Sequence, residues 1–382
     1  MSTDPLDRLR GAAAAREAAG LRRHVRGRGP DEPLLDLASN NYLGLARDPR
    51  VKAAAAEAAL TWGGGSTGSR LVTGSTELHA QLEAALASFT GSAAGLVFSS
   101  GYLANIGTIA ALGGPNVLVV SDAANHASVI DGTRLSRSRV CVTPHCDVGA
   151  VEAALSGRSE EHALVVTDAV FSVDGDLAPI RGLHDVARRH GALLIVDEAH
   201  ALGVVGVRGQ GAVDAAGLSG EADVIRTVTL SKALGAQGGA VLGAPEVIET
   251  LVNTARAFIF DTGLAPAAAG AALAALRALE AEPQLAEQAR DRAVELARSA
   301  AAAGLEPSAP AAAVVSVLIG APENALRAAQ TCRDHGVHVG CFRPPAVPPG
   351  RSCLRLTARA NLSDEDVALA NAALCAAAAA LR

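Results

Sequence analysis

The stretch LLIVDEAH, residues 193–200, runs from four apolar side chains directly into Asp197, Glu198 and His200. A run that is apolar nearly throughout is typical of a β-strand buried on both faces of a sheet. Five further runs of this kind are AGLVFSS (94–100), NVLVVSD (116–122), ALVVTDAVFS (163–172), DVIRTVTLS (223–231) and GGAVLG (238–243). Because Ala- and Leu-rich helical stretches alternate with these runs, the pattern predicts an α/β fold with a mostly parallel central sheet flanked by helices.

The chain is predicted to consist of three parts. These are an N-terminal helix and substrate-side segment (1–46), a large domain (47–283) and a smaller α+β C-terminal domain (284–382). We expect a helix over 4–20 in the first part, and a final helix that begins after Ser363 in the last. The other elements predicted near and within the last part are a helical stretch over 264–303 interrupted at Pro283, strands over 312–320 and 353–357, and a helix over 322–335.

Composition and charge exclude several classes of function. Hydrophobic residues make up 49% and charged residues 19% of the 382 residues, which is ordinary for a globular protein. The net charge is −6 and no block of Lys or Arg stands out, so we expect no nucleic-acid partner. No apolar run reaches transmembrane length, and the N-terminus resembles neither a signal nor a transit peptide. The sequence therefore predicts a cytoplasmic protein without membrane contact.

The six cysteines are scattered and form no Cys-x-x-Cys pair. Cys141 and Cys146 flank His145, an arrangement that leaves a metal site open. Ordinary reduced thiols in a cytoplasmic protein are the favoured interpretation, and no metal is predicted.

The letters DEAH also end a strand in helicase-like ATPases, where the acids hold Mg²⁺ and a water. That chemistry requires a phosphate-binding loop with a Lys and a Ser or Thr. In the nearest candidate, GGGSTGSR (63–70), Ser69 and Arg70 stand where those residues are required, and a predicted helix rather than a strand precedes it. The sequence therefore argues against an ATPase.

A second motif, TVTLSKALGAQGG (227–239), places Lys232 directly after a buried strand, among hydroxyl groups and glycines. Ligands of open α/β sheets bind at the carboxyl ends of strands, where Lys232, Asp197 and His200 are expected to meet. A lysine whose pKa is lowered by burial can attack a carbonyl. Lys232 is therefore predicted to form a Schiff base with a carbonyl compound.

Pyridoxal phosphate, PLP, requires such a lysine and an Asp that pairs with its ring nitrogen. The motif FSSGYLAN (98–105) supplies a strand, Ser99, Ser100 and Gly101, and then a helix start whose backbone N–H groups can bind phosphate. His126, in NHASVIDG, can cover one face of the ring. The sequence therefore predicts PLP as the cofactor.

In these motifs the chain resembles the α-oxoamine synthase family, PLP-dependent enzymes of the fold-type I aminotransferase class. The resemblance covers nearly the whole chain, with the motifs in the family's order. The motifs are LDLASNNYLGL, GGGSTGSRLVTGSTELHAQLE, FSSGYLANIG, NHASVIDG, VTDAVFSVDGDLAPI, VDEAHALGVVG, TLSKALGAQGG, FIFDTGLAP and RPPAVPPGRSCLRL.

The resemblance implies a role for each matching residue, four of them catalytic. Lys232 would carry PLP covalently, Asp197 would pair with the ring nitrogen, and His200 would hydrogen-bond the ring 3′-oxygen, while His126 would stack on the ring. The other implied cofactor contacts are Ser172 near the ring oxygen, Thr229 and the backbone of Gly101 and Tyr102 at the phosphate, and Thr262 at the phosphate of a neighbouring subunit. The implied substrate contacts are Arg343 at the amino-acid carboxylate, and Asn40 and Arg22 on the acyl-substrate side.

Four activities compete within the family: synthesis of 8-amino-7-oxononanoate, glycine C-acetyltransferase, 5-aminolevulinate synthase and serine palmitoyltransferase. The run RPPAVPPG (343–350) resembles the first, which joins L-alanine to a pimeloyl thioester and releases CO₂ and the thiol in biotin synthesis. Whether coenzyme A or an acyl carrier protein bears the thioester stays open. The resemblance also implies a homodimer with the active site at the subunit interface. A catalytically dead partner subunit is the alternative of another class, against which the retained Lys232 argues.

Overall fold

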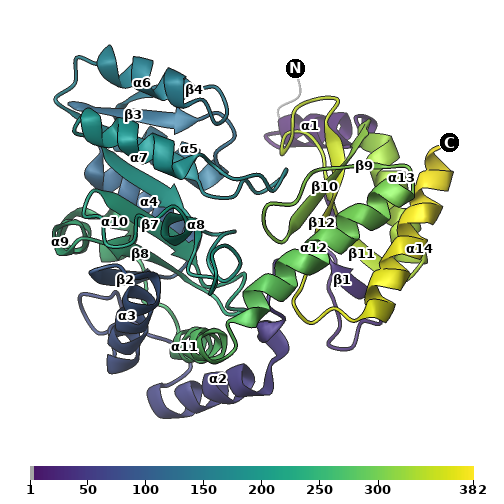
Figure 1. Cartoon of the computed structure of the whole chain (residues 1–382), viewed down its shortest axis with the longest axis horizontal. Helices are drawn as coiled ribbons and strands as arrows, with labels where there is room; N and C mark the ends of the chain where they lie inside the picture. Colours follow the sequence, from purple (N-terminus) through teal and green to yellow (C-terminus); the bar gives the residue numbers. More distant parts are fainter. Residues whose placement is uncertain (1–3) are drawn as a thin grey trace.

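The computed structural model describes residues 4–382, and a seven-stranded sheet forms the core of its larger body (Figure 1). The strands lie in the order β2 (Ala94–Phe98), β8 (Gly239–Gly243), β7 (Val224–Thr229), β6 (Leu193–Asp197), β5 (His162–Asp168), β3 (Val117–Asp122) and β4 (Arg139–Thr143). Only β8 runs antiparallel to its neighbours. The predicted α/β class and the mostly parallel sheet are confirmed.

The inner strands of this sheet send alternate side chains into two separate cores. Ile195 packs in one core, whereas its neighbours Leu194 and Val196 pack in the other. Because both faces of the sheet are covered, both sets of positions must be apolar. This explains why the strands appear in the sequence as unbroken apolar runs.

Helices cover this sheet and connect it to the rest of the molecule (Figure 1). They are α2 (Pro49–Trp62), α3 (Glu77–Thr90), α4 (Gly101–Leu112), α5 (Ala127–Ser136), α6 (Val148–Ser156), α7 (Ile180–Arg189), α8 (Ala212–Ala215), α9 (Pro245–Thr254), α10 (Arg256–Ile259) and α11 (Pro266–Ala281), with a 3₁₀ turn η1 (Leu45–Arg47). The predicted break at Pro283 separates α11 from α12 (Gln284–Ala302), which leads to the smaller body.

A second sheet of five strands forms the smaller body. The strands lie in the order β1 (Leu35–Leu37), β11 (Val337–Phe342), β12 (Ser352–Thr357), β10 (Val314–Gly320) and β9 (Glu306–Pro307). The helices of this body are α13 (Pro322–Asp334) and α14 (Asp364–Leu381), which Ser363 caps as predicted. Since β1 pairs in parallel with β11, a piece of the predicted N-terminal segment is built into the C-terminal sheet. The domain boundaries themselves stay a prediction.

Four strands were not predicted, and all four are short or polar. β1 and β9 have three and two residues, β4 is an edge strand whose side chains are mostly exposed, and β11 contains His338. Such strands lack the apolar run by which the sequence reveals the others. The first helix, α1 (Asp7–Ala18), is shorter than predicted and has no buried residue. None of the described helices combines the length and the apolar composition that crossing a membrane requires.

Candidate active site

The predicted lysine and histidine are in contact at the carboxyl ends of two neighbouring strands. Lys232 follows β7 and His200 follows β6, and the Lys232 Nζ atom lies 3.0 Å from His200 Nε2. The turn around Lys232 is fixed by backbone bonds from Leu230 to Gly238 and from Ala236 to Leu230. The structure therefore brings together the two motifs DEAH and LSKALG.

The amine of Lys232 is buried, and this changes its acidity. Burial lowers its pKa to about 8, while Asp197 and Asp168 oppose this shift and Arg355 adds to it. A pKa of about 8 leaves about a tenth of the amines unprotonated at pH 7, against well under one in a thousand for an ordinary lysine. Lys232 is therefore suited to act as a nucleophile and as a base.

His200 connects Lys232 to two residues from the N-terminal segment. Its Nδ1 atom contacts the hydroxyl of Tyr42, which in turn donates to Asn40 Oδ1 at 3.2 Å. Burial, with Lys232 and Arg355 nearby, lowers the pKa of His200 well below its usual value, so the ring is neutral. A protonated Lys232 can only donate to Nε2, which places the single ring proton of His200 on Nδ1.

Asp197, the last residue of β6, is held by two donors. The backbone N–H of Ala199 donates to Oδ1 at 2.9 Å, and the side-chain amide of Asn105 donates to Oδ2 at 2.6 Å. Asn105 is oriented by the hydroxyl of Thr227, which donates to its oxygen at 2.5 Å, and it also donates to Ser128. These bonds fix the orientation of the Asp197 carboxyl group.

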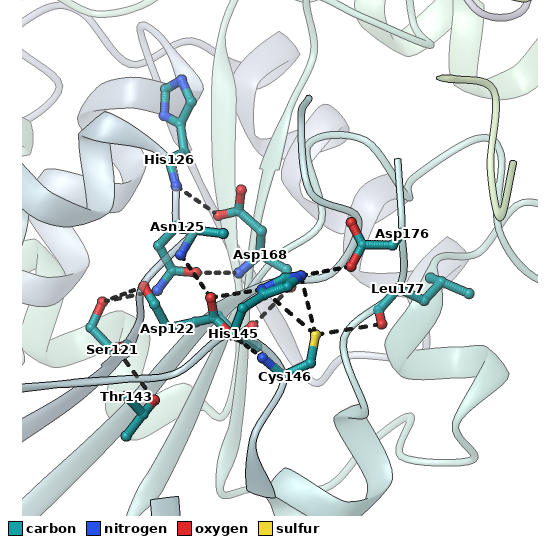
Figure 2. Close-up of polar contacts among 12 residues, drawn as sticks. Ser121, Asp122, Asn125, His126, Thr143, His145, Cys146, Asp168, Asp176 and Leu177 are labelled. Carbon is teal, nitrogen blue, oxygen red and sulfur yellow. Dashed lines mark hydrogen bonds and ion pairs between the residues drawn. The ribbon is translucent and has the colours of Figure 1, made fainter. Parts of the chain in front are cut away.

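A second carboxyl group, Asp168, lies at the paired position of the neighbouring strand β5. Its Oδ1 atom accepts a bond from the backbone N–H of His126 at 3.3 Å, and its backbone N–H donates to Asn125, whereas its buried Oδ2 has no partner (Figure 2). Burial, together with the charge of Asp197, raises the pKa of Asp168 well above its usual value. The protonated form of Asp168 is therefore favoured.

His126 caps the start of α5, with its Nδ1 atom 2.7 Å from the hydroxyl of Ser128. Burial lowers the pKa of His126, which favours the neutral ring, although Asp197 opposes the shift. Because Ser128 also contacts Asn105, His126 belongs to the same hydrogen-bonded group as Asp197.

The predicted phosphate side is the start of α4, which Ser100 caps by accepting a bond from Leu103 N–H. A Cβ atom on Gly101 would lie 3.0 Å from Thr229 Cβ, so this helix start packs directly on the end of β7. A Cβ atom on Gly239 would lie 2.4 Å from Gly101 N, which explains the glycine of β8 at this position. The structure thus brings Gly101 and Thr229 together, with Tyr102 in the first turn of the helix.

Ser172 lies in the turn that follows β5, and its carbonyl accepts a bond from Arg355 Nε at 2.7 Å. Arg355 lies on β12, is 3% exposed and also donates to Asn40 Oδ1 at 2.9 Å. Its Nη2 atom has no partner, and no carboxylate of residues 4–382 forms an ion pair with it. Arg355 is thus a buried cation next to the predicted site.

Sequence reasoning missed Tyr42, Asn105, Asp168 and Arg355 as members of this site. A charged or polar residue inside an otherwise apolar element was the available signal for two of them. Arg355 interrupts the strand SCLRLT, and Asn105 interrupts the helix GYLANIGTIAAL.

Three predicted site residues lie apart from this group. Arg343 donates to the backbone oxygen of Gly20, and Arg22 pairs with the exposed Glu17 at 2.8 Å. Both side chains thus contact the N-terminal segment in this structure, and their predicted substrate roles stay predictions. Thr262 forms an isolated bridge with Ser69, near the end of the Gly-rich segment 63–70. Its predicted role at a neighbouring subunit stays a prediction.

Two residues from the motifs compared with an ATPase have structural partners. Arg70 donates to Val97 O and pairs with Glu83 at 2.8 Å. Glu198 is fully buried, accepts a bond from Val213 N–H and lies 3.6 Å from Arg226. Both side chains therefore connect parts of the fold to one another.

Comparisons with known proteins agree with this arrangement. The model of the family "Aminotransferase class I and II" matches residues 32–374. A curated relative from Mycolicibacterium smegmatis, named 8-amino-7-oxononanoate synthase, is 60% identical over 97% of this chain and 96% of its own length. A relative of the same name from Mycobacterium tuberculosis is 57% identical over 97% and 95%.

Solved structures include a serine palmitoyltransferase variant from S. paucimobilis with bound PLP and myriocin, at 30% identity, with a TM-score of 0.92 and 99% of each chain covered. An 8-amino-7-oxononanoate synthase from Francisella tularensis has 26% identity and a TM-score of 0.77, with 90% of this chain and 97% of that chain covered. The chain therefore belongs to the class I and II aminotransferase family and, within it, to the α-oxoamine synthases, and its relatives at 57–60% identity carry the name 8-amino-7-oxononanoate synthase.

Proposed function

We propose that this protein catalyses the condensation of L-alanine with a pimeloyl thioester to give 8-amino-7-oxononanoate, CO₂ and a free thiol, with PLP as its cofactor. The observation that carries the proposal is the buried Lys232 amine, with a pKa of about 8, in contact with neutral His200 and close to Asp197. The relatives at 57–60% identity, all named for this activity, support it.

The residues present fit PLP. Asp168 Oδ2 and Arg355 Nη2 are buried polar atoms without partners, next to a lysine that can bind an aldehyde. The glycines at 101 and 239 keep the space at the helix start free of side chains, where backbone N–H groups suit a phosphate. We propose that Lys232 holds the cofactor and Asp197 its ring nitrogen, with His126 on the ring face. The proposed contacts to the ring oxygen are His200 and Ser172, and those to the phosphate are Gly101, Tyr102 and Thr229.

When bound, PLP supplies an electron sink for the amino-acid Cα. In our proposal the neutral Lys232 Nζ takes the Cα proton of alanine and later returns a proton to the same carbon. Asp197, oriented by its bonds from Asn105 and Ala199, would hold a proton at the ring nitrogen. Neutral His200 keeps the Lys232 amine in place without competing for its proton.

The carboxylate of alanine requires a cation, and two arginines are candidates. Arg355 is buried, carries an unpartnered Nη2 and lowers the pKa of Lys232, so it lies within electrostatic reach of the amine. Arg343 would first have to leave its contact with Gly20. We propose Arg355 as the primary anchor. Arg343, on its proline-flanked segment, stays a proposed second contact, and Asn40 a proposed contact on the acyl side.

We also propose a homodimer. Exposed apolar side chains gather on the two loops that the Ser69–Thr262 bridge joins: Leu71 and Val72 on one, and Phe260 on the other. A second copy that covers them would place Thr262 at the interface, next to its partner's cofactor. Light scattering of the purified protein tests the dimer, and Phe260→Glu should raise the fraction of monomer.

The test of the activity is turnover by the purified protein with PLP. L-Alanine, glycine and serine are each combined with pimeloyl, acetyl, succinyl and palmitoyl thioesters, and the products are identified by mass spectrometry. We expect product only from alanine and the pimeloyl thioester. Serine with palmitoyl thioester is the rival combination, since serine palmitoyltransferases are among the similar solved structures. Parallel reactions with coenzyme A and acyl carrier protein identify the carrier. A protein that binds no PLP, as judged by absorbance, would be the dead partner subunit instead.

The six described cysteines are free thiols, which suits the proposed cytoplasmic location.

A further inference from the structure

His145, between β4 and α6, lies between two acidic side chains (Figure 2). Its Nδ1 atom is 3.0 Å from Asp122 Oδ1, and its Nε2 atom is 2.8 Å from Asp176 Oδ2. Asp122 ends β3 of the large sheet, whereas Asp176 belongs to the turn after β5. His145 thus connects the sheet to this turn.

The geometry determines the charge of the ring. A carboxylate can only accept hydrogen bonds, and a neutral imidazole has only one N–H to donate. Both ring nitrogens of His145 face carboxylate oxygens at hydrogen-bond distance. Asp122 is already committed as an acceptor, because the backbone N–H groups of Ala124 and Cys146 donate to it. Only the imidazolium form of His145 satisfies both contacts with two ionised carboxylates.

The turn that Asp176 belongs to, residues 171–178, is the one that carries Ser172. It is closed by bonds from Phe171 N–H to Asp176 O and from Gly175 N–H to Phe171 O. The ring of His145 also packs edge-on against Phe171, with the ring centroids 4.3 Å apart. His145 therefore contacts the turn at two points, one polar and one aromatic.

The smaller body holds the same turn from the other side. Arg355 donates to Ser172 O, and a Cβ atom on Gly175 would lie 2.7 Å from Val314 O of β10. The turn also lines a cavity of about 1010 Å³ between the two bodies, with His145, Pro345 and Arg351 among its other walls. Without His145, the turn would keep its contacts with the smaller body and a long bond from the Cys146 thiol to Leu177 O at 3.9 Å.

The Cys146 thiol also lies beside the ring. Its Sγ atom is 3.8 and 3.7 Å from the two ring nitrogens, farther than the carboxylate oxygens of Asp122 and Asp176. Burial also raises the pKa of Cys146 to about 11, which disfavours a thiolate. The arrangement suits a proton on the ring.

We propose that His145 is a positioning residue that, as a cation between Asp122 and Asp176, fixes the turn carrying Ser172 in the active site. Its effect on turnover rests on the proposed function, whereas its charge and its hold on the turn do not. The other charged groups around this cavity are Asp174 and Arg351, which lie 3.6 Å apart, and Glu306. None of these is hydrogen-bonded to His145.

The pH dependence follows from the two acidic contacts. Burial lowers the pKa of His145, but the bonds to Asp122 and Asp176 outweigh it and raise the pKa above the usual value of 6.5. The contacts of protonated His145 with Asp122 and Asp176 are therefore both present below pH 6.5. This pair of contacts is lost as the pH rises through the raised pKa of His145 in the folded protein. Above that pH, one of the two carboxylates loses its hydrogen bond.

The direct test is an NMR titration of His145 in the holoenzyme and in matched variants. Asp176→Asn removes one acidic contact, and Asp174→Asn makes the same charge change in the same turn without contacting His145. We expect a pKa above 6.5 in the wild type, a fall of about one pH unit in Asp176→Asn and almost no change in Asp174→Asn. A wild-type pKa of 6.5 or lower, or equal shifts in both variants, overturns the proposal.

Hydrogen exchange tests the hold on the turn without any turnover. His145→Gln and Asp176→Asn should lower the protection of the Gly175 and Phe171 amides at least tenfold, and Asp174→Asn should not. In the assay, kcat should fall about tenfold in His145→Gln with the KM for alanine almost unchanged, less than the hundredfold cost of a 1 Å misplacement. Unchanged exchange in His145→Gln would show that the smaller body alone fixes the turn. Failure of turnover in every variant and in the wild type would contradict the proposed function, but it would not contradict the role of His145 in fixing the turn.

Discussion

The two sides of the candidate site are built differently. On the cofactor side, Lys232, His200 and Asp197 stand at the ends of neighbouring buried strands, and each has fixed partners. On the side predicted for the substrate, Arg22 contacts the exposed Glu17 and Arg343 contacts the backbone of Gly20. A rigid sheet positions the first set, whereas loops and long side chains position the second. The residues proposed for the cofactor therefore have their positions before binding, whereas Arg22 and Arg343 would have to leave their present partners to reach a substrate.

Replacing Lys232 should have the largest effect on turnover, because no other residue of the proposed site can bind PLP covalently. Lys232→Ala should abolish turnover and the PLP absorbance. Lys52, which is exposed, is the only other lysine in the sequence, so Lys52→Ala is a matched control that should stay fully active. Borohydride trapping followed by peptide mapping checks the attachment. A label on Lys52 in the wild type would contradict the assignment.

Asp197→Asn should have the second largest effect on turnover. An amide cannot hold a proton at the ring nitrogen, so turnover should fall by about 10²- to 10³-fold, or roughly 3–4 kcal/mol, while PLP stays bound. Steady-state kinetics and the absorbance spectrum measure the two effects. Near-normal turnover would mean that another carboxylate, with Asp168 the nearest candidate, serves the ring.

Burial of the Lys232 amine should lower the free energy of unfolding of the cofactor-free chain by about 3 kcal/mol below pH 8. The pKa of Lys232 falls from 10.5 to about 8 on folding, so the unfolded chain binds more protons between these values. Stability should therefore rise with pH across this window, and the cost of burial is fully present below pH 8. Urea unfolding at pH 7.5, 8.5 and 9.5 measures the slope. Lys232→Met should flatten it, whereas a slope that survives this change would point to another group.

The two arginines give a direct test of the substrate side. Arg355→Lys keeps the charge but loses the planar guanidinium, and Arg355→Ala loses both. We expect the KM for alanine to rise about tenfold and about a hundredfold, respectively, the usual cost of removing a buried charged partner. Arg343→Ala should raise it only a few-fold. If Arg343→Ala proves the more damaging variant, the segment 343–350 moves onto the substrate and Arg355 is structural.

The smallest effect is expected at Asp168. Its raised pKa favours the protonated carboxyl, which the amide of Asp168→Asn resembles in shape and charge. Turnover and PLP affinity should change less than about threefold, in contrast to Asp197→Asn. A large loss in Asp168→Asn would mean that Asp168 is ionised in the holoenzyme and that the two carboxyls act as a pair.

The sequence predicted the cofactor side well, for a physical reason. Strands buried on both faces are visible as apolar runs, and parallel strands gather the residues that follow them at one edge. Lys232, Asp197 and His200 could therefore be placed together from their motifs. Arg355 and Tyr42 could not, because they reach the site only through the packing of the second sheet. The role predicted for Arg343 stays a prediction, since proline flanks restrict a backbone without fixing where a long side chain points.

The pairing of β1 with β11 has a consequence for how the protein is made. Almost the whole chain separates Leu35 from its partner Val337. During synthesis the large sheet, whose last strand ends at Gly243, can form before β11 exists to pair with β1. Closing the long loop between β1 and β11 is then slow. Asn40 and Tyr42 follow β1, and Arg355 lies on β12, so they reach His200 and Ser172 only when synthesis is nearly finished. A nascent chain therefore carries its lysine in a folded sheet long before it can hold a substrate.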